Sequence, residues 1–139
     1  MIEAIVGLKG SGKSSILVDE ITDISNTKDT NVVCIEYGKR FNQNIPYQVR
    51  LIDITEYPVR DYRELITFIA GVSAKDHDIT HFYIDSLYKI ANSTKIDELE
   101  KFFDDLDELT KNMAATFIIT ISDDPDKMPE NVKRAMRDF

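Results

Sequence analysis

The sequence has very little of several residue types that mark common protein classes. Of its 139 residues only Cys34 is a cysteine and none is a tryptophan, which excludes a disulfide within the chain and a disulfide-stapled module. No apolar run reaches the roughly eighteen residues that a membrane span requires, and the N-terminal residues do not resemble a secretory signal. We therefore expect a cytoplasmic protein without membrane association, in which Cys34, within NVVCIEY, is a small core residue.

Basic residues are also scarce. The chain has 17 Lys and Arg against 25 Asp and Glu, which gives a formal net charge of −8. Because nucleic-acid backbones are bound by clustered Lys and Arg, we do not expect an extended nucleic-acid-binding face. The acidic excess is concentrated in KIDELEKFFDDLDEL (95–109), where it predicts the solvated face of an amphipathic helix.

Short apolar, β-branched segments alternate with helical patterns along the whole chain. Strands that are apolar on both sides and alternate with helices are typical of a parallel sheet covered on both faces. The sequence thus predicts an α/β protein, a three-layer α/β/α fold with a mostly parallel sheet of about five strands, in a single domain spanning 1–139. The predicted strands are 2–6, 31–36, 49–54, 80–85 and 115–122, and the predicted helices are 13–25, 59–74, about 94–112 and a short closing helix within 129–139.

A glycine-rich turn separates the first strand from the first helix. GLKGSGKS, starting at Gly7, matches the phosphate-binding pattern G-x-x-x-x-G-K-[ST] in the required strand–loop–helix context. Glycines allow the backbone to turn its N–H groups toward one anion, and the following helix directs its positive end at the same place. Lys13 would contact the β- and γ-phosphates, and the Ser14 hydroxyl would bind Mg²⁺. The residues predicted to bind nucleotide are Gly7, Leu8, Lys9, Gly10, Ser11, Gly12, Lys13, Ser14 and Ser15.

Two carboxylates at predicted strand ends could complete such a site. Asp85 ends HFYID, where it could bind Mg²⁺ opposite Ser14; the alternative is an ordinary strand-ending turn residue or cap. Asp85 is followed by Ser86 and not by the glutamate that activates water in many ATPases. Glu36, at the end of VVCIE, is the candidate that could orient the attacking water and act with Lys13 as a catalytic residue. Alternatively, Glu36 pairs with Lys39 or Arg40.

The succession GLKGSGKSS, VVCIE, HFYIDSL and TFIITISDD resembles the RecA/KaiC-like branch of P-loop ATPases over residues 2–124. The resemblance implies a catalytic glutamate on the strand after the loop helix, which is Glu36 here. It also implies that the 115–122 strand lies between the loop strand and the Asp85 strand. That strand would end in a residue that senses the γ-phosphate, here Ser122, with Thr120 and Asp123 beside it. The alternative for Ser122 is a plain strand end.

The chain departs from that family in two ways. The family usually continues with further strands and subunit-bridging loops, whereas this sequence ends soon after TFIITISDD, so ring assembly is not expected to follow from the resemblance. The family also often completes its site with a Lys or Arg from an adjoining subunit. The clustered candidates here are Lys133, Arg134 and Arg137, for which a solvated helix face is the alternative.

The sequence leaves several functions open. The first is a Mg²⁺-dependent ATP-binding protein that hydrolyses ATP to ADP slowly, since no dependable in-chain arginine finger is evident. The second is a nucleotide-gated module for a protein partner or a second copy of the chain, with negligible turnover. The third is a small-molecule kinase, for which no lid-length insertion follows Asp85. TKID (94–97) also fits a guanine-reading pattern, but a helix start capped by Thr94 explains it as well.

Overall fold

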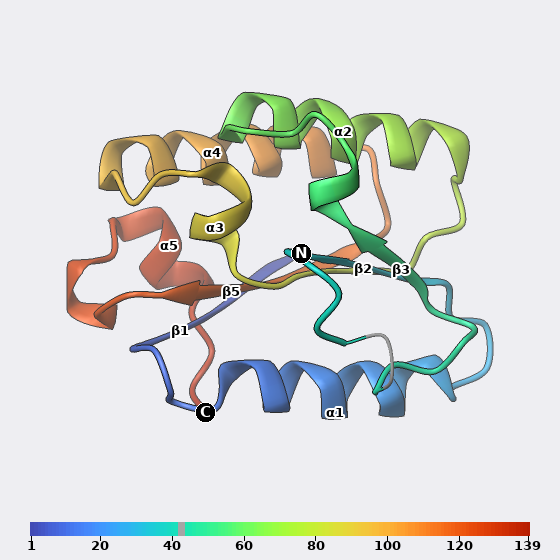
Figure 1. Cartoon of the computed structure of the whole chain (residues 1–139). Helices are drawn as coiled ribbons and strands as arrows, with labels where there is room; N and C mark the ends of the chain where they lie inside the picture. The colour runs from blue at the N-terminus through green and yellow to red at the C-terminus, as the bar shows by residue number, and fades with distance from the viewer. Residues whose placement is uncertain (42–43) are drawn as a thin grey trace.

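The computed structural model describes residues 1–41 and 44–139. Its centre is a five-stranded sheet in the order β1-β5-β4-β2-β3 (Figure 1), and every pair of neighbouring strands is parallel. The predicted α/β class and parallel sheet are thus confirmed. The strands are β1 (Ile2–Gly7), β2 (Val32–Glu36), β3 (Arg50–Asp53), β4 (His81–Ile84) and β5 (Thr116–Ser122).

Helices cover both faces of the sheet, which gives three layers. Figure 1 shows α1 alone below the sheet, while α2 and α4 lie above it with α3 and α5 beside them. The helices are α1 (Lys13–Ser25), α2 (Tyr62–Lys75), α3 (Leu87–Ala91), α4 (Ile96–Thr110) and α5 (Glu130–Ala135), with two 3₁₀ turns at Ile54–Glu56 and Pro125–Lys127. Among the helices of the described residues, none combines the length and apolar character needed to cross a membrane.

The inner strands β2, β4 and β5 are largely buried on both sides, as their continuous apolar sequences predict, whereas the edge strand β3 is only partly buried. All five residues of β2 are buried: Val33 and Ile35 face the four-helix layer, whereas Cys34 faces α1. Across the central strand pair, Phe82 and Phe117 are register partners whose rings stack with centroids 4.7 Å apart. The Cys34 side chain is fully buried as predicted, and burial raises the pKa of its thiol, with Asp85 and Glu36 adding to the effect.

Side-chain hydrogen bonds to backbone amides mark the residues at which α2 and α4 begin. α2 begins after Asp61, whose carboxylate accepts the Glu64 amide at 2.8 Å. The predicted Thr94 cap of α4 is wrong, since the cap position is Lys95, without a side-chain cap bond. Instead, Ser93 Oγ accepts the Lys95 amide at 3.2 Å. The amphipathic helix predicted for 95–109 is confirmed, with apolar residues buried and its acidic residues on the outer face.

The short closing helix predicted within 129–139 is confirmed as α5, although it covers only the first part of that range. α5 ends at Ala135, and the chain then runs along the outer edge of β1, where Met136 bridges to Ala4 in parallel and the Arg137 amide donates to the Ala4 carbonyl at 2.8 Å. The Arg137 guanidinium pairs with Glu3 at 3.0 Å and with Glu20 of α1. Arg137 is therefore not part of a solvated helix face, because its charge is used within the chain.

Candidate functional site

The turn after β1 needs its glycines for identifiable reasons. β1 ends at Gly7 and α1 begins at Lys13, and between them Gly10 and Gly12 have φ of 85° and 90°, values that side-chain-bearing residues rarely adopt. At Gly7 an added Cβ would lie 2.6 Å from Ser11 Oγ and 2.7 Å from the Phe139 ring, so these side chains would have to shift. The loop conformation therefore depends most on Gly12, which the sequence pattern requires, and on Gly10.

Lys13 is the first residue of α1 and is buried against the loop. Its ammonium Nζ donates to the Leu8 carbonyl at 3.1 Å and reaches Ser11 Oγ at 3.5 Å. Burial lowers the pKa of Lys13, while the charge of Asp85 opposes that shift. The lysine is thus held beside the loop by a carbonyl oxygen, a partner that an anionic ligand could replace.

Asp85 accepts hydrogen bonds from three hydroxyl groups. Its Oδ1 accepts Thr120 Oγ1 at 2.8 Å and Ser14 Oγ at 3.3 Å, and its Oδ2 accepts Ser86 Oγ at 3.0 Å. The carboxylate is 1% exposed. Ser14 and Asp85, which are 71 positions apart, therefore face each other as expected from the sequence.

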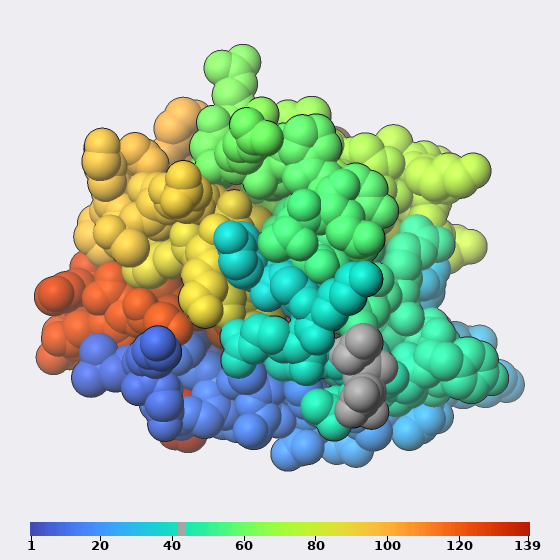
Figure 2. Space-filling model, viewed as in Figure 1, coloured from blue at the N-terminus to red at the C-terminus, as the bar shows by residue number. Residues whose placement is uncertain are grey.

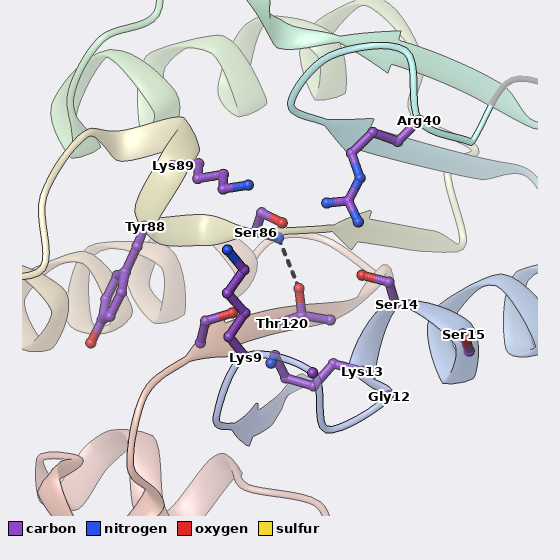
Figure 3. A pocket seen from close by; sticks show the side chains of 12 residues that line it. Lys9, Gly12, Lys13, Ser14, Ser15, Arg40, Ser86, Tyr88, Lys89 and Thr120 are labelled. Carbon is purple, nitrogen blue, oxygen red and sulfur yellow. Dashed lines mark hydrogen bonds between the residues drawn. The ribbon is translucent and has the colours of Figure 1, made fainter.

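The backbone after Asp85 is held in an unusual conformation. Ser86 has φ 64° and ψ 57°, the left-handed region that a non-glycine residue enters at an energetic cost. Its amide donates to Thr120 Oγ1 at 2.8 Å, drawn as a dashed line in Figure 3. Thr120 thus joins the ends of β4 and β5 by accepting from Ser86 and donating to Asp85.

A cavity of about 420 Å³ opens over this end of the sheet. In Figure 2 the blue loop after β1, the cyan segment after β2 and the yellow start of α3 come together on one face of the molecule. Four cationic side chains line the cavity and no acidic one does among the described residues, although the chain as a whole is acidic. The lining residues (Figure 3) are Lys9, Gly10, Gly12, Lys13, Ser14, Ser15, Arg40, Ser86, Tyr88, Lys89, Thr120 and Ser122.

Glu36 lies at the same sheet edge but does not line the cavity. β2 neighbours β4, and the Asp85 amide donates to the Ile35 carbonyl, so the end of β2 is beside Asp85. Glu36 Oε1 accepts the amides of Arg40 at 2.9 Å and Phe41 at 3.0 Å. Within residues 1–41 and 44–139, its Oε2 is buried without a hydrogen-bond partner.

Two roles were predicted for Glu36, orienting the attacking water or pairing with Lys39 or Arg40, and these contacts test only the second. No ion pair joins it to Lys39 or Arg40 within the described part of the chain, so the predicted side-chain pairing is wrong. Burial raises the pKa of the Glu36 carboxyl, the amides of Phe41 and Arg40 oppose that shift, and the charges of Asp53 and Asp85 add to it. Its water-orienting role stays a prediction.

The last strand has the position that the resemblance implies. β5 lies between β1 and β4, and Ser122 is paired in register with Gly7. The Asp123 amide donates to the Gly7 carbonyl at 3.1 Å, which ties the strand end to the start of the loop. Ser122 lines the cavity, so its place is compatible with a sensor, and that role stays a prediction.

Sequence reasoning did not assign four cavity residues to the site: Ser86, the α3 residues Tyr88 and Lys89, and Arg40. α3 is short and has no strong pattern, and Tyr88 is fixed by a 2.8 Å hydrogen bond from its hydroxyl to Asp123 Oδ2. Lys89 follows Asp85 by four positions, a spacing that gave no signal without knowledge of the turn at Ser86. Arg40 reaches the cavity because β2 is next to β4.

The available oxygens suit a hard cation of few protein ligands. Mg²⁺ typically takes one or two protein oxygens and completes its octahedron with water and phosphate. The Asp85 carboxylate and the Ser14 hydroxyl beside it are such a pair. No group of three or more His, Cys, Asp or Glu gathers as a self-contained metal site in the part of the chain that the structure describes.

No family model and no curated protein matches this sequence.

Proposed function

We propose that this chain is a Mg²⁺-dependent ATP-binding protein of the RecA/KaiC-like P-loop type that hydrolyses ATP slowly. One observation carries the proposal: Ser14 of the glycine loop contacts Asp85 beside a cavity that is lined by cations, Lys13 among them. A polyphosphate complements this arrangement, because it is strongly anionic and compact and can displace the lysine from its carbonyl partner.

The residues of the loop supply the contacts that phosphates require. The N-terminus of α1 follows Gly12 and presents backbone N–H groups and a positive dipole end to an anion. Lys13 would exchange the Leu8 carbonyl for phosphate oxygens, and Lys9 and Lys89 would add positive charge from opposite sides (Figure 3). In a chain of net charge −8, this local concentration of cations is what favours an anionic ligand.

Ser14 and Asp85 are the residues that would hold Mg²⁺. A bound Mg²⁺ neutralises charge on the β- and γ-phosphates during phosphoryl transfer. Asp85 is already oriented for that task, since Thr120 and Ser86 hold its two oxygens in place.

We expect slow turnover because the Glu36 carboxylate is buried and hydrogen-bonded to backbone amides. Its carboxylate would have to orient the attacking water, yet one oxygen accepts two amides and the side chain is 1% exposed. The same observation favours the second candidate, a nucleotide-gated interaction module whose protein partner or second copy distinguishes the ATP state from the ADP state.

Calorimetry of Mg²⁺-ATP binding tests the proposal directly. We expect the wild type to bind ATP in preference to GTP and the Lys13→Ala variant to lose binding. Lys101→Ala is the matched control, because Lys101 is an exposed lysine of α4 paired only with Asp105 among the described residues. Absence of ATP binding by the wild type would contradict the proposal.

Turnover and assembly separate the two candidates once binding is established. Slow phosphate release that depends on Lys13 would support the ATPase. Negligible release, together with an ATP-dependent change of sedimentation coefficient or of partner binding, would support the gated module.

A further inference from the structure

We propose that Arg40 is a phosphate-contacting residue supplied by this chain itself, and that Glu36 is its positioning residue. The inference rests on the proposed function and deepens it, because it assigns a second cationic contact to the ligand's terminal phosphates. It also gives Glu36 a role different from the water-orienting one predicted from the sequence.

The Arg40 side chain points into the cavity from the side opposite the glycine loop. Figure 3 shows its guanidinium extending toward Ser14, across the cavity from Lys13. Its NH1 lies 3.9 Å from Asp85 Oδ2, and the side chain is 51% exposed. At that distance the pair is loose, so the guanidinium is free to take a stronger anionic partner.

The backbone that carries Arg40 is fixed by two carboxylates at the ends of neighbouring strands. Glu36 of β2 accepts the amides of Arg40 and Phe41, and Asp53 of β3 accepts the Gly38 amide at 2.9 Å. Gly38 has φ 84°, which makes the tight turn between these contacts. Three amides in four residues are thus bound to acidic side chains.

Phe41 anchors the far end of the same segment. Its ring is 5% exposed and belongs to the core cluster between the sheet and α1. Lys39 and Arg40 are both exposed cations of this segment, but only Arg40 lines the cavity. Because its backbone is already fixed, Arg40 would lose side-chain but little backbone conformational entropy on binding, and its planar donors match phosphate oxygens.

The arrangement also explains why Glu36 is buried with one oxygen used twice. A residue that orients water must present an oxygen to the ligand, whereas Glu36 directs Oε1 at the backbone and is not among the residues that line the cavity. The carboxylate therefore acts on the ligand through Arg40, as a positioning residue.

Charge-matched variants of neighbouring residues test the role of Arg40. Affinity is measured by calorimetry for Mg²⁺-ATP, Mg²⁺-ADP and inorganic tripolyphosphate. We expect Arg40→Gln to weaken ATP and tripolyphosphate binding about tenfold or more, the size of one charge-assisted hydrogen bond, and ADP binding less. Lys39→Gln removes the same charge one residue away and should change each affinity less than about twofold.

Two substitutions of Glu36 separate positioning from water orientation. Glu36→Gln keeps an oxygen that can accept the two amides, so we expect ATP affinity within about threefold of wild type. Glu36→Ala should reproduce the affinity loss of Arg40→Gln, and the double variant should be no weaker than either single one. Loss of turnover in Glu36→Gln with ATP affinity unchanged would overturn the positioning role.

Amide hydrogen exchange gives a readout that does not depend on activity or on Glu36→Ala being folded. The Arg40 and Phe41 amides should be protected in the wild type and in Glu36→Gln. Unprotected amides, or equal effects of Arg40→Gln and Lys39→Gln, would refute the inference while ATP binding by the wild type stood. A wild type that binds none of the three ligands would instead refute the proposed function, and the inference with it.

Discussion

Arg137 and Glu20, from the end of the chain and from the first helix, form an ion pair beside β1. Glu3 joins them, and Tyr83 donates its hydroxyl to Glu20 at 3.1 Å. Both carboxylates pair with one guanidinium that is 25% exposed, so the positive charge holds two like charges together.

Removing that guanidinium should destabilise the protein. We expect Arg137→Met to lower the free energy of unfolding by about 1–3 kcal/mol, because Glu3 and Glu20 would remain partly buried without their partner. Chemical denaturation measures this. Arg134→Met, an exposed charge on α5, should change stability by less than about 0.5 kcal/mol, and equal effects of the two would contradict the prediction.

The Thr120 hydroxyl is expected to contribute to both the stability of the protein and its ligand affinity. Thr120→Val keeps the shape but removes the donor to Asp85 and the acceptor for Ser86, leaving a polar group without its partner. We expect a loss of about 1–3 kcal/mol in unfolding free energy and, under the proposed function, weaker Mg²⁺-ATP binding. Thr116→Val, at the opposite end of β5, is the control and should leave ligand affinity unchanged.

The Asp53 carboxylate should make stability depend on acid pH. Burial alone would raise its pKa, but hydrogen bonds from the Thr55 hydroxyl and amide and from the Gly38 amide lower it overall, with Lys39 assisting. Its stabilisation is therefore present above the unfolded-state pKa of about 4 and lost as pH falls through the lower folded value.

The measurement compares Asp53→Asn with wild type by denaturation across pH. The variant should be less stable at pH 7, and the difference should shrink steadily below about pH 4. If the difference in unfolding free energy between the variant and wild type instead grew on acidification, the lowered pKa of Asp53 would be contradicted. Asp19→Asn, on the exposed face of α1, removes the same charge and should stay within about 0.5 kcal/mol of wild type.

Two glycines with open space around them should respond to alanine with opposite signs. Gly38 has φ 84°, so Gly38→Ala is strained and should cost about 1–2 kcal/mol. Gly71 is an exposed position inside α2, so Gly71→Ala should stabilise by about 0.5–1 kcal/mol. Thermal unfolding of both variants checks this, and the same sign for both would contradict it.

Elements with strong local patterns could be predicted from the sequence. α1 was expected at residues 13–25 and lies at Lys13–Ser25, because glycine punctuation and helical spacing agree there. The Ser14–Asp85 contact could also be anticipated, since carboxyl ends of parallel strands share one sheet edge.

What the sequence did not predict depends on contacts between distant segments. α3 is too short for periodicity to show, and Arg137 resembled a surface charge because Glu3 and Glu20 are far away in sequence. The contacts of Glu36 depend on a turn at Gly38 that folds the backbone over the strand end. None of these leaves a repeating signal in a single sequence.

The strand order has a consequence for the time at which the cavity can form. β1 pairs with β5, in a register that joins Ile2 to Phe117, so β1 leaves the ribosome long before its neighbour in the sheet exists. Such distant pairing slows folding and keeps an apolar segment uncovered meanwhile. The glycine loop and Asp85 are brought together in the same late event, and a chain able to hold a ligand there has thereby completed its sheet.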